Sequence, residues 1–156
     1  MAETRFAVRS LEVSESITID RSADVVRRQF ADVAHHQAAG VHRGVRFEVL
    51  DDDGQRCRYR QVSRAGPLKL TQEFELPRSD EGPLVNSITR GQFRGGKISF
   101  VVAPVSSGQS TVQATVVSQV SGVESLLLPL LRLIVRRTLA RALAEDKADL
   151  EGGYPA

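Results

Sequence analysis

The stretch from Val45 to Val120 alternates apolar and polar residues in short runs, and turn-forming residues separate these runs without a helical period between them. Phe47 and Val49 continue the first run, and Asp53-Gly54 after it is typical of a hairpin turn. The pattern predicts strands at 45–49, 56–61, 70–76, 84–91, 97–103 and 111–120. Strands joined by short turns pair antiparallel, and the apolar face of such a sheet must be covered by another element.

A further strand is predicted at Leu11–Asp20, which brings the sheet to about seven strands. A short helix is expected next, because Ser22 can cap it and apolar residues follow. These residues recur at helical spacing: Val26, Phe30 and Val33. Residues 35–42 show no clear period, and Gly40 is expected to end any helix that remains there.

The last third of the chain holds the one long segment left to cover the sheet. Ser121 and Glu124 have capping-box spacing, Pro129 is expected to kink the helix early, and residues 130–151 are good helix formers. One line along this helix is apolar: Leu128, Leu131, Val135, Leu139 and Ala142. The opposite side is basic: Arg136, Arg137, Arg141 and Lys147. We therefore predict that this helix lies across the concave side of a curved sheet.

The apolar line of this helix also carries Asp146, with Asp149 at its edge and Glu145 well off it. A carboxylate that faces a core needs a partner, because a lone buried charge is costly. One interpretation is a structural ion pair with His42 or Arg43. The other interpretation is a metal site.

Length and composition set broad limits. The 156 residues predict a single domain at 11–151, with flexible termini at 1–10 and 152–156. Cys57 is the single cysteine, which excludes an intrachain disulfide and a cysteine zinc site and favours a small buried hydrophobe. A net charge of +2 and the absence of Trp do not favour nucleic-acid binding. No secretory signal or bilayer-spanning run is apparent, so we expect a cytoplasmic protein without stable membrane insertion.

Two surfaces have more than one interpretation. Arg56, Arg58 and Arg60 form a basic row, either a solvated convex face that pairs with Glu73 and Glu75 or a patch for an acidic ligand. The apolar segment between positions 126 and 135, with its arginines, has the composition of a membrane-docking surface. We favour the solvated face for the first, and a role in covering the sheet for the second.

The order strand, helix, six strands and long C-terminal helix resembles the START / polyketide-cyclase-like superfamily, the helix-grip fold also called SRPBCC. The resemblance covers Ile17 to Leu150 and implies an α+β fold with a deep apolar cavity between the long helix and the sheet. Members of this superfamily bind lipids, sterols, hormones or polyketides, and some are cyclases or hydrolases.

A shorter stretch is similar to the catalytic domain of Rieske-type oxygenases. Asp32-Val33-Ala34-His35 and Val41-His42-Arg43-Gly44 resemble the segment that supplies two histidine ligands to mononuclear iron, and 145–151 resembles the acidic segment of the last helix. The resemblance implies Fe(II) ligands at His35 or His36, at His42 and at Asp146. That family has four residues between its two histidines. Here six residues separate His35 from His42, and five separate His36 from His42. No Rieske cluster motif is present, so an oxygenase would need a separate reductase.

Three hypotheses follow. The first is binding or transport of a hydrophobic small molecule (a lipid, polyketide or aromatic compound), which needs no cofactor. Its cavity would be lined by Phe47, Tyr59, Phe74, Phe100, Leu131, Val135 and Leu139. The second is a mononuclear non-haem iron enzyme. The third is a cofactor-free polyketide cyclase or dehydratase that uses Tyr59 or a cavity histidine as general acid or base.

Overall fold

A seven-stranded antiparallel sheet and one long helix make up most of the molecule. The computed structural model describes residues 8–65 and 68–156, and all element bounds refer to these. The sheet has the strand order β1-β7-β6-β5-β4-β3-β2. Its strands are β1 (Arg9–Ile19), β2 (Val45–Asp52), β3 (Arg56–Ala65), β4 (Leu68–Pro77), β5 (Leu84–Arg90), β6 (Lys97–Ser106) and β7 (Gln109–Val120). The helices are α1 (Ala23–Ala31), α2 (Val33–Ala39), α3 (Val123–Leu126) and α4 (Leu128–Gly152).

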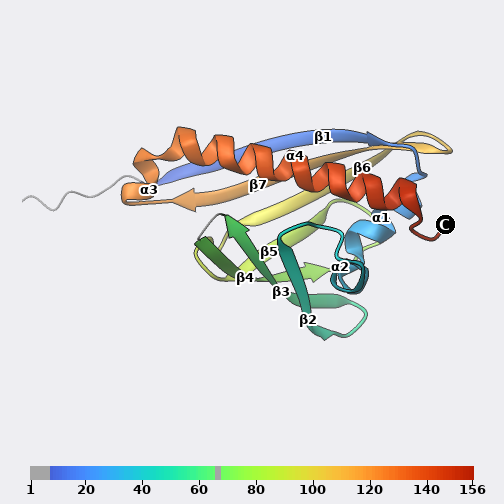
Figure 1. Cartoon of the computed structure of the whole chain (residues 1–156), viewed down its shortest axis with the longest axis horizontal. Helices are drawn as coiled ribbons and strands as arrows, with labels where there is room; N and C mark the ends of the chain where they lie inside the picture. The colour runs from blue at the N-terminus through green and yellow to red at the C-terminus, as the bar shows by residue number, and fades with distance from the viewer. Residues whose placement is uncertain (1–7, 66–67) are drawn as a thin grey trace, which may run out of the picture.

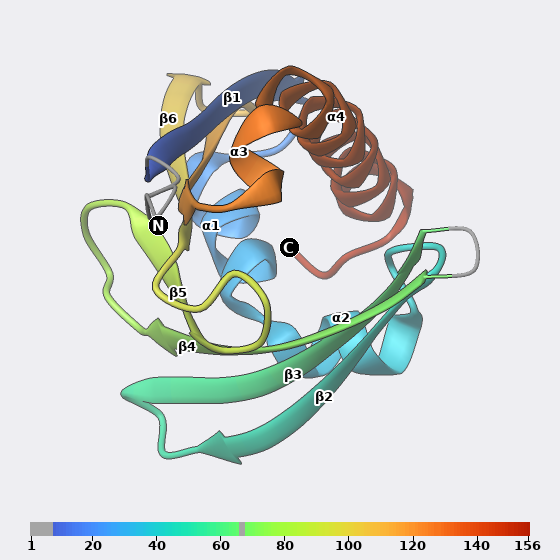
Figure 2. The same cartoon turned by 90° about the vertical axis from the view of Figure 1, so that its left-hand side faces the viewer.

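The α+β helix-grip architecture predicted from the sequence is confirmed. Figure 1 shows α4 running nearly the full length of the molecule, beside β1 and β7. Seen along that length, the sheet bends from β1 and β6 to β2 and β3, and α4 lies on its open side (Figure 2). The inward side chains of α4 are those of the predicted apolar line and its neighbours, including Leu128, Leu131, Val135, Leu139 and Leu143. The concave face of the sheet is therefore covered, as its alternation requires.

The start of the long helix differs from the prediction. A short helix, α3, follows Gly122 and ends before Leu127, and α4 begins there as a separate helix. Pro129 lies in the first turn of α4, where the backbone N–H has no helical partner in any case. Pro129 therefore marks a helix start and does not kink a continuous helix. Ser121 caps neither helix, since Gly122 is the N-cap of α3 and makes no side-chain bond.

A helix missed in the sequence follows α1. Ser22 is the N-cap residue of α1, but its side chain makes no capping bond. Asp32 then ends α1 and starts α2, where its side chain accepts a hydrogen bond from the backbone N–H of His35 at 2.9 Å. Gly40 ends α2 in the left-handed conformation at φ 61°, as its sequence position predicts.

The hairpins hold the sheet in register. Gly91, which follows β5, has φ 113°, and a Cβ there would lie 2.8 Å from the carbonyl oxygen of Thr71. Only glycine fits this close approach between β4 and the β5–β6 hairpin.

On the convex face, Arg60 pairs with Glu73 at 3.1 Å and Arg56 with Glu75 at 3.5 Å. These cross-strand ion pairs are the ones expected if the basic row is a solvated convex face, which is the interpretation that we favoured.

The C-terminal residues, expected to be a flexible tail, make defined contacts with the start of the chain. Tyr154 is buried at 6% exposure, and its hydroxyl donates to Asp32 at 3.0 Å. Arg21 donates to the backbone carbonyl of Tyr154, and Arg28 to that of Pro155. At the other end, residues 1–7 of the expected flexible segment lie outside the described part, whereas Arg9 and Ser10 already pair with β7. No helix of the described chain is long and apolar enough to cross a membrane.

Candidate functional site

A cavity of about 360 Å³ lies between α4 and the concave face of the sheet. Six of the seven residues predicted to line a cavity do so: Phe47, Tyr59, Phe100, Leu131, Val135 and Leu139. Phe74 does not line it, because its ring is stacked on Tyr59 at 5.1 Å between centroids, one strand further along the sheet. Cys57 is also buried in the core outside the cavity wall, where burial raises the pKa of its thiol.

The wall is mainly apolar and carries a few polar groups. The Tyr59 hydroxyl donates to Oδ1 of Asn86 at 2.8 Å. Burial raises the pKa of Tyr59 far above its ordinary value, so this phenol stays protonated and is unsuited to act as a base. Gln72 and Ser118 also line the wall, and in the described chain neither Oε1 of Gln72 nor Oγ of Ser118 has a hydrogen-bond partner. Both side chains are more than nine-tenths buried, so these oxygens are unmet polar groups beside the cavity.

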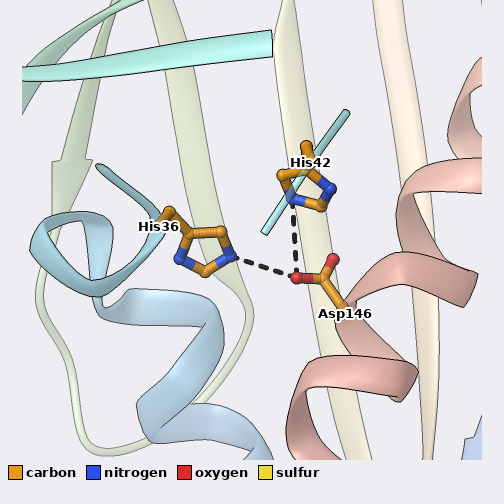
Figure 3. Close-up of side chains that lie close together, drawn as sticks. All are labelled: His36, His42 and Asp146. Atoms are coloured by element: carbon orange, nitrogen blue, oxygen red, sulfur yellow. Dashed lines mark hydrogen bonds and ion pairs between the residues drawn. The ribbon is translucent and has the colours of Figure 1, made fainter. Parts of the chain in front are cut away.

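At the α2 side of the cavity, two histidines face one carboxylate. His36 lies on α2, His42 lies in the segment between α2 and β2, and Asp146 lies on α4 (Figure 3). Nε2 of His36 is 3.1 Å from Oδ1 of Asp146, and Nε2 of His42 is 3.5 Å from the same oxygen. One ligand atom from each residue falls within 4.8 Å of the others, and all three residues line the cavity.

The far nitrogen of each ring is fixed by an acceptor. Nδ1 of His36 donates to the backbone carbonyl of Asp32 at 2.8 Å, one helical turn earlier. Nδ1 of His42 lies 3.0 Å from Oε2 of Glu145, the carboxylate adjacent to Asp146 on α4. Because a carbonyl or carboxylate oxygen can only accept here, each ring carries its proton on Nδ1 and turns Nε2 towards Asp146.

Asp146 has no strong cation beside it. Only 4% of this residue is exposed, and among the residues whose positions are described no lysine or arginine lies within 4.0 Å of its carboxylate. Its other partner is Gln29, whose Nε2 donates to Asp146 at 3.1 Å and to Asp149 at 3.0 Å. The negative charge is thus balanced by the histidines alone or by a bound cation.

The protonation of His36 reflects this arrangement. Burial alone would lower the pKa of His36, but the hydrogen bond from its ring to Asp146 and the negative charge of Asp146 outweigh burial. The carbonyl of Asp32 and the charge of Asp149 act in the same direction, so the pKa is raised above its ordinary value. Without a metal, His36 therefore faces an acceptor at both nitrogens and favours the imidazolium form.

His35 lies apart from this group. Its Nε2 contacts Asp149 at 2.9 Å, and its ring packs edge-on against Tyr154 at 4.7 Å between centroids. Of the two histidines that the sequence left open as ligands, the structure brings His36 rather than His35 to His42 and Asp146. The choice follows from α2, since one face of that helix turns His36 inwards.

The trio fits a divalent metal by the chemistry of its donors. Two imidazole nitrogens and one carboxylate oxygen converge from three segments, and two histidines with one carboxylate suit non-haem Fe(II). Metal-binding histidines commonly donate their second N–H to a carboxylate or a backbone carbonyl, as His36 and His42 do here. Oε1 of Gln29, beside the cluster, is a buried acceptor with no partner in the described structure.

Several site residues were not foreseen. Gln29 lies on α1 in an unremarkable polar position, and Glu145 lies off the apolar line of α4, so neither carried a sequence signal. Gln72 alternates with Leu70 and Phe74 on one strand face, which is the one pattern that could have marked it as inward-facing.

Comparison with known proteins shows which solved structures share this fold. No protein-family model and no curated protein matches the sequence. The solved structures that it resembles include the Zhui aromatase/cyclase from Streptomyces sp. R1128, at TM-score 0.79 and 13% identity, over 92% of this chain and 94% of that one. A START superfamily protein from Mycobacterium smegmatis matches at TM-score 0.75 and 15% identity, over 90% and 97%. The chain has the START-like helix-grip fold.

A third similar structure with this helix-grip fold carries small aromatic ligands. It is norcoclaurine synthase from Thalictrum flavum in complex with dopamine and hydroxybenzaldehyde, at TM-score 0.70 and 15% identity, over 97% of this chain and 91% of that one. At these identities, what the three structures share with this chain is the fold.

Proposed function

We propose that this protein binds a hydrophobic small molecule in the cavity between α4 and the sheet. The observation that carries the proposal is the cavity of about 360 Å³ with a mostly apolar wall. Its volume suits a compact lipid, polyketide or aromatic compound, and similar folds include an aromatase/cyclase and a synthase solved with aromatic ligands.

The ligand that we propose also carries a hydrogen-bonding group. Gln72 Oε1 and Ser118 Oγ are buried beside the cavity without partners, and an unmet buried polar group costs about 1–3 kcal/mol. Each oxygen is itself covered by neighbouring atoms, so its side chain would have to turn towards the cavity before a hydroxyl or amine on the ligand could satisfy it. A purely aliphatic ligand would leave both unmet.

The test fills the cavity from α4. Val135→Trp replaces a lining side chain by a large one, whereas Leu133→Trp places the same ring on the exposed side of the same helix. Binding of N-phenyl-1-naphthylamine, a neutral apolar fluorophore, should be lost in the first variant and kept in the second. Leu131→Trp provides a second block if Val135→Trp unfolds. Equal binding of the fluorophore by Val135→Trp and Leu133→Trp would contradict the proposal.

A second function is favoured by the convergence of His36, His42 and Asp146. We propose that these three residues hold a divalent metal, Fe(II) by preference, at one end of the cavity. A bound iron would supply open coordination positions for chemistry on a cavity ligand. Asp32 and Glu145 would orient the two histidine rings. An oxygenase reaction would also need electrons from a separate reductase, as the resemblance implies.

The metal is tested by titration of chelator-treated protein with Co²⁺ or Fe²⁺ under anaerobic conditions, followed by calorimetry. His42→Ala should abolish stoichiometric binding, and His35→Ala should retain it, because His35 lies outside the trio. The matched pair removes the same kind of ring, once from α2 and once from the segment that follows it. Equal affinity in the two variants, or no binding by the unmodified protein, would exclude the metal site.

A further inference from the structure

The first turns of the α3–α4 region leave an unusual number of large aliphatic side chains in solvent. The members of this surface, which we call the α3–α4 patch, are Val123, Leu126, Leu127, Leu130, Leu133 and Ile134. Each is between 44% and 66% exposed. They are not the residues that cover the sheet, because that role falls to Leu128, Leu131 and Val135 on the opposite side.

The segment 126–135 therefore holds two sets of apolar residues, one that covers the sheet and one that faces solvent. The break between α3 and α4 at Leu127 turns part of the apolar sequence outwards. Large aliphatic side chains exposed together on neighbouring helical turns are typical of an interaction site. Figure 1 shows α3 and the start of α4 at one end of the molecule, far from α1 and α2.

The charge around the α3–α4 patch is mainly positive: Glu124 is the one carboxylate among residues 123–134, and Arg136 also pairs with Glu15 at 3.2 Å. From 125 to 144 the chain has four arginines and no carboxylate; the arginines are Arg132, Arg136, Arg137 and Arg141. All four are exposed, with 65% of the Arg136 side chain and 60% of the Arg141 side chain accessible. An apolar surface with a basic border is complementary to an anionic lipid surface, where the aliphatic groups enter the interface and the arginines contact phosphates.

The patch also continues into the cavity wall. Ile134 is 48% exposed and at the same time lines the cavity, and its neighbour Thr138 on the same helix lines it too. Ile134 thus belongs to both the patch and the cavity wall, and on the same helix the wall also includes Arg141.

We infer that the α3–α4 patch docks the protein on the surface of an anionic lipid bilayer. A symmetric contact between two copies fits less well, because it would bring the arginines of both copies together. The docking is peripheral, in accord with the absence of a membrane-spanning helix among residues 8–65 and 68–156. It stands on the exposed side chains and their charge, and does not depend on the proposed cavity ligand.

The experiment is co-sedimentation of the full chain with two kinds of vesicle, phosphatidylcholine alone and phosphatidylcholine mixed with phosphatidylglycerol. The protein should sediment with the mixed vesicles and much less with the neutral ones, and added salt should weaken the binding. Leu126→Gln/Leu130→Gln should lower the partition coefficient at least about tenfold, since it removes two interfacial aliphatic groups. Arg132→Gln/Arg137→Gln should lower it and weaken its dependence on salt.

The matched control is Val101→Gln/Val105→Gln, which changes two exposed valines on β6, outside the patch. This control should sediment like the unmodified protein. Equal sedimentation of Leu126→Gln/Leu130→Gln and Val101→Gln/Val105→Gln would overturn the inference. So would a dimer in analytical ultracentrifugation that Leu126→Gln/Leu130→Gln dissociates, because the patch would then join two copies of the chain. Val135→Trp separates the proposals, since it should block the cavity and leave sedimentation unchanged.

Discussion

The two halves of α4 differ in the kind of contact that they make with the rest of the protein. The first half carries an aliphatic stripe inwards and further leucines outwards, and its charges are all arginines. The second half carries four carboxylates (Glu145, Asp146, Asp149 and Glu151), of which Asp146 is 4% exposed and is held by histidines from a distant part of the chain. The comparison shows that the helix closes the cavity by apolar packing at one end and by a polar cluster at the other.

The difference also shows what each end is free to do. At the first end, aliphatic side chains can be exchanged with little loss of fit because many face solvent. At the second end, Glu145, Asp146 and Asp149 each have a histidine partner, so a single change leaves another group unmet. Four changes test this contrast, in order of decreasing effect.

Truncation of a buried leucine in the second half should have the largest effect. Leu143→Ala removes a side chain that is 2% exposed, and we expect the free energy of unfolding to fall by about 2–5 kcal/mol. Leu133→Ala in the first half, at 44% exposure, should change it by less than about 0.5 kcal/mol. Urea unfolding measures both. Similar losses in the two variants would remove the distinction between the halves.

Removal of the buried carboxylate should come next. Asp146→Ala leaves Nε2 of Gln29 and Nε2 of His36 without this acceptor, so we expect a loss of about 1–3 kcal/mol in metal-free protein. Lys147→Ala is the neighbouring control, because it breaks a partly exposed pair with Glu151 and an exposed hydrogen bond to the carbonyl of Thr18, and it should cost about 0–1 kcal/mol. A smaller loss for Asp146→Ala than for the control would argue against a tightly satisfied cluster.

The pH dependence of stability should be smaller and specific to His36. Because the pKa of His36 is raised in the folded state, its protonation stabilises the fold below the unfolded value of 6.5, and that contribution is lost as the pH rises through the raised pKa. Thermal unfolding of chelator-treated protein should therefore show a decline on the alkaline side of 6.5 that His36→Gln lacks. An unchanged profile in this variant would assign the decline to another group.

Replacement of the proline at the start of α4 should have the smallest effect. Pro129 lies in the first turn, where no hydrogen bond is lost, so Pro129→Ala should change the free energy of unfolding by less than about 1 kcal/mol. Ala140→Pro, in the middle of the helix, should cost about 3 kcal/mol or more. A large effect of Pro129→Ala would mean that the two helices behave as one kinked helix.

The sequence predicted the strands, their antiparallel order and the covering helix, because alternation and turn residues report directly on faces and connections. It placed Asp146 inwards because the helical period puts this residue on the apolar line of α4. It could not decide between His35 and His36, since residues 35–42 have no period and α2 depends on the local cap at Asp32. Phe74 was assigned to the cavity because it shares a face with its neighbours, but alternation says nothing about where a curved sheet turns a side chain away from the open space.

The burial of Tyr154 makes the end of the chain part of the cluster's support. Its ring packs on His35, and its hydroxyl binds the same aspartate that starts α2. Loss of the last three residues would open the His35–Asp149 pair to water and free one oxygen of Asp32. A purification tag for this protein therefore belongs at its N-terminus, away from the segment that packs on His35.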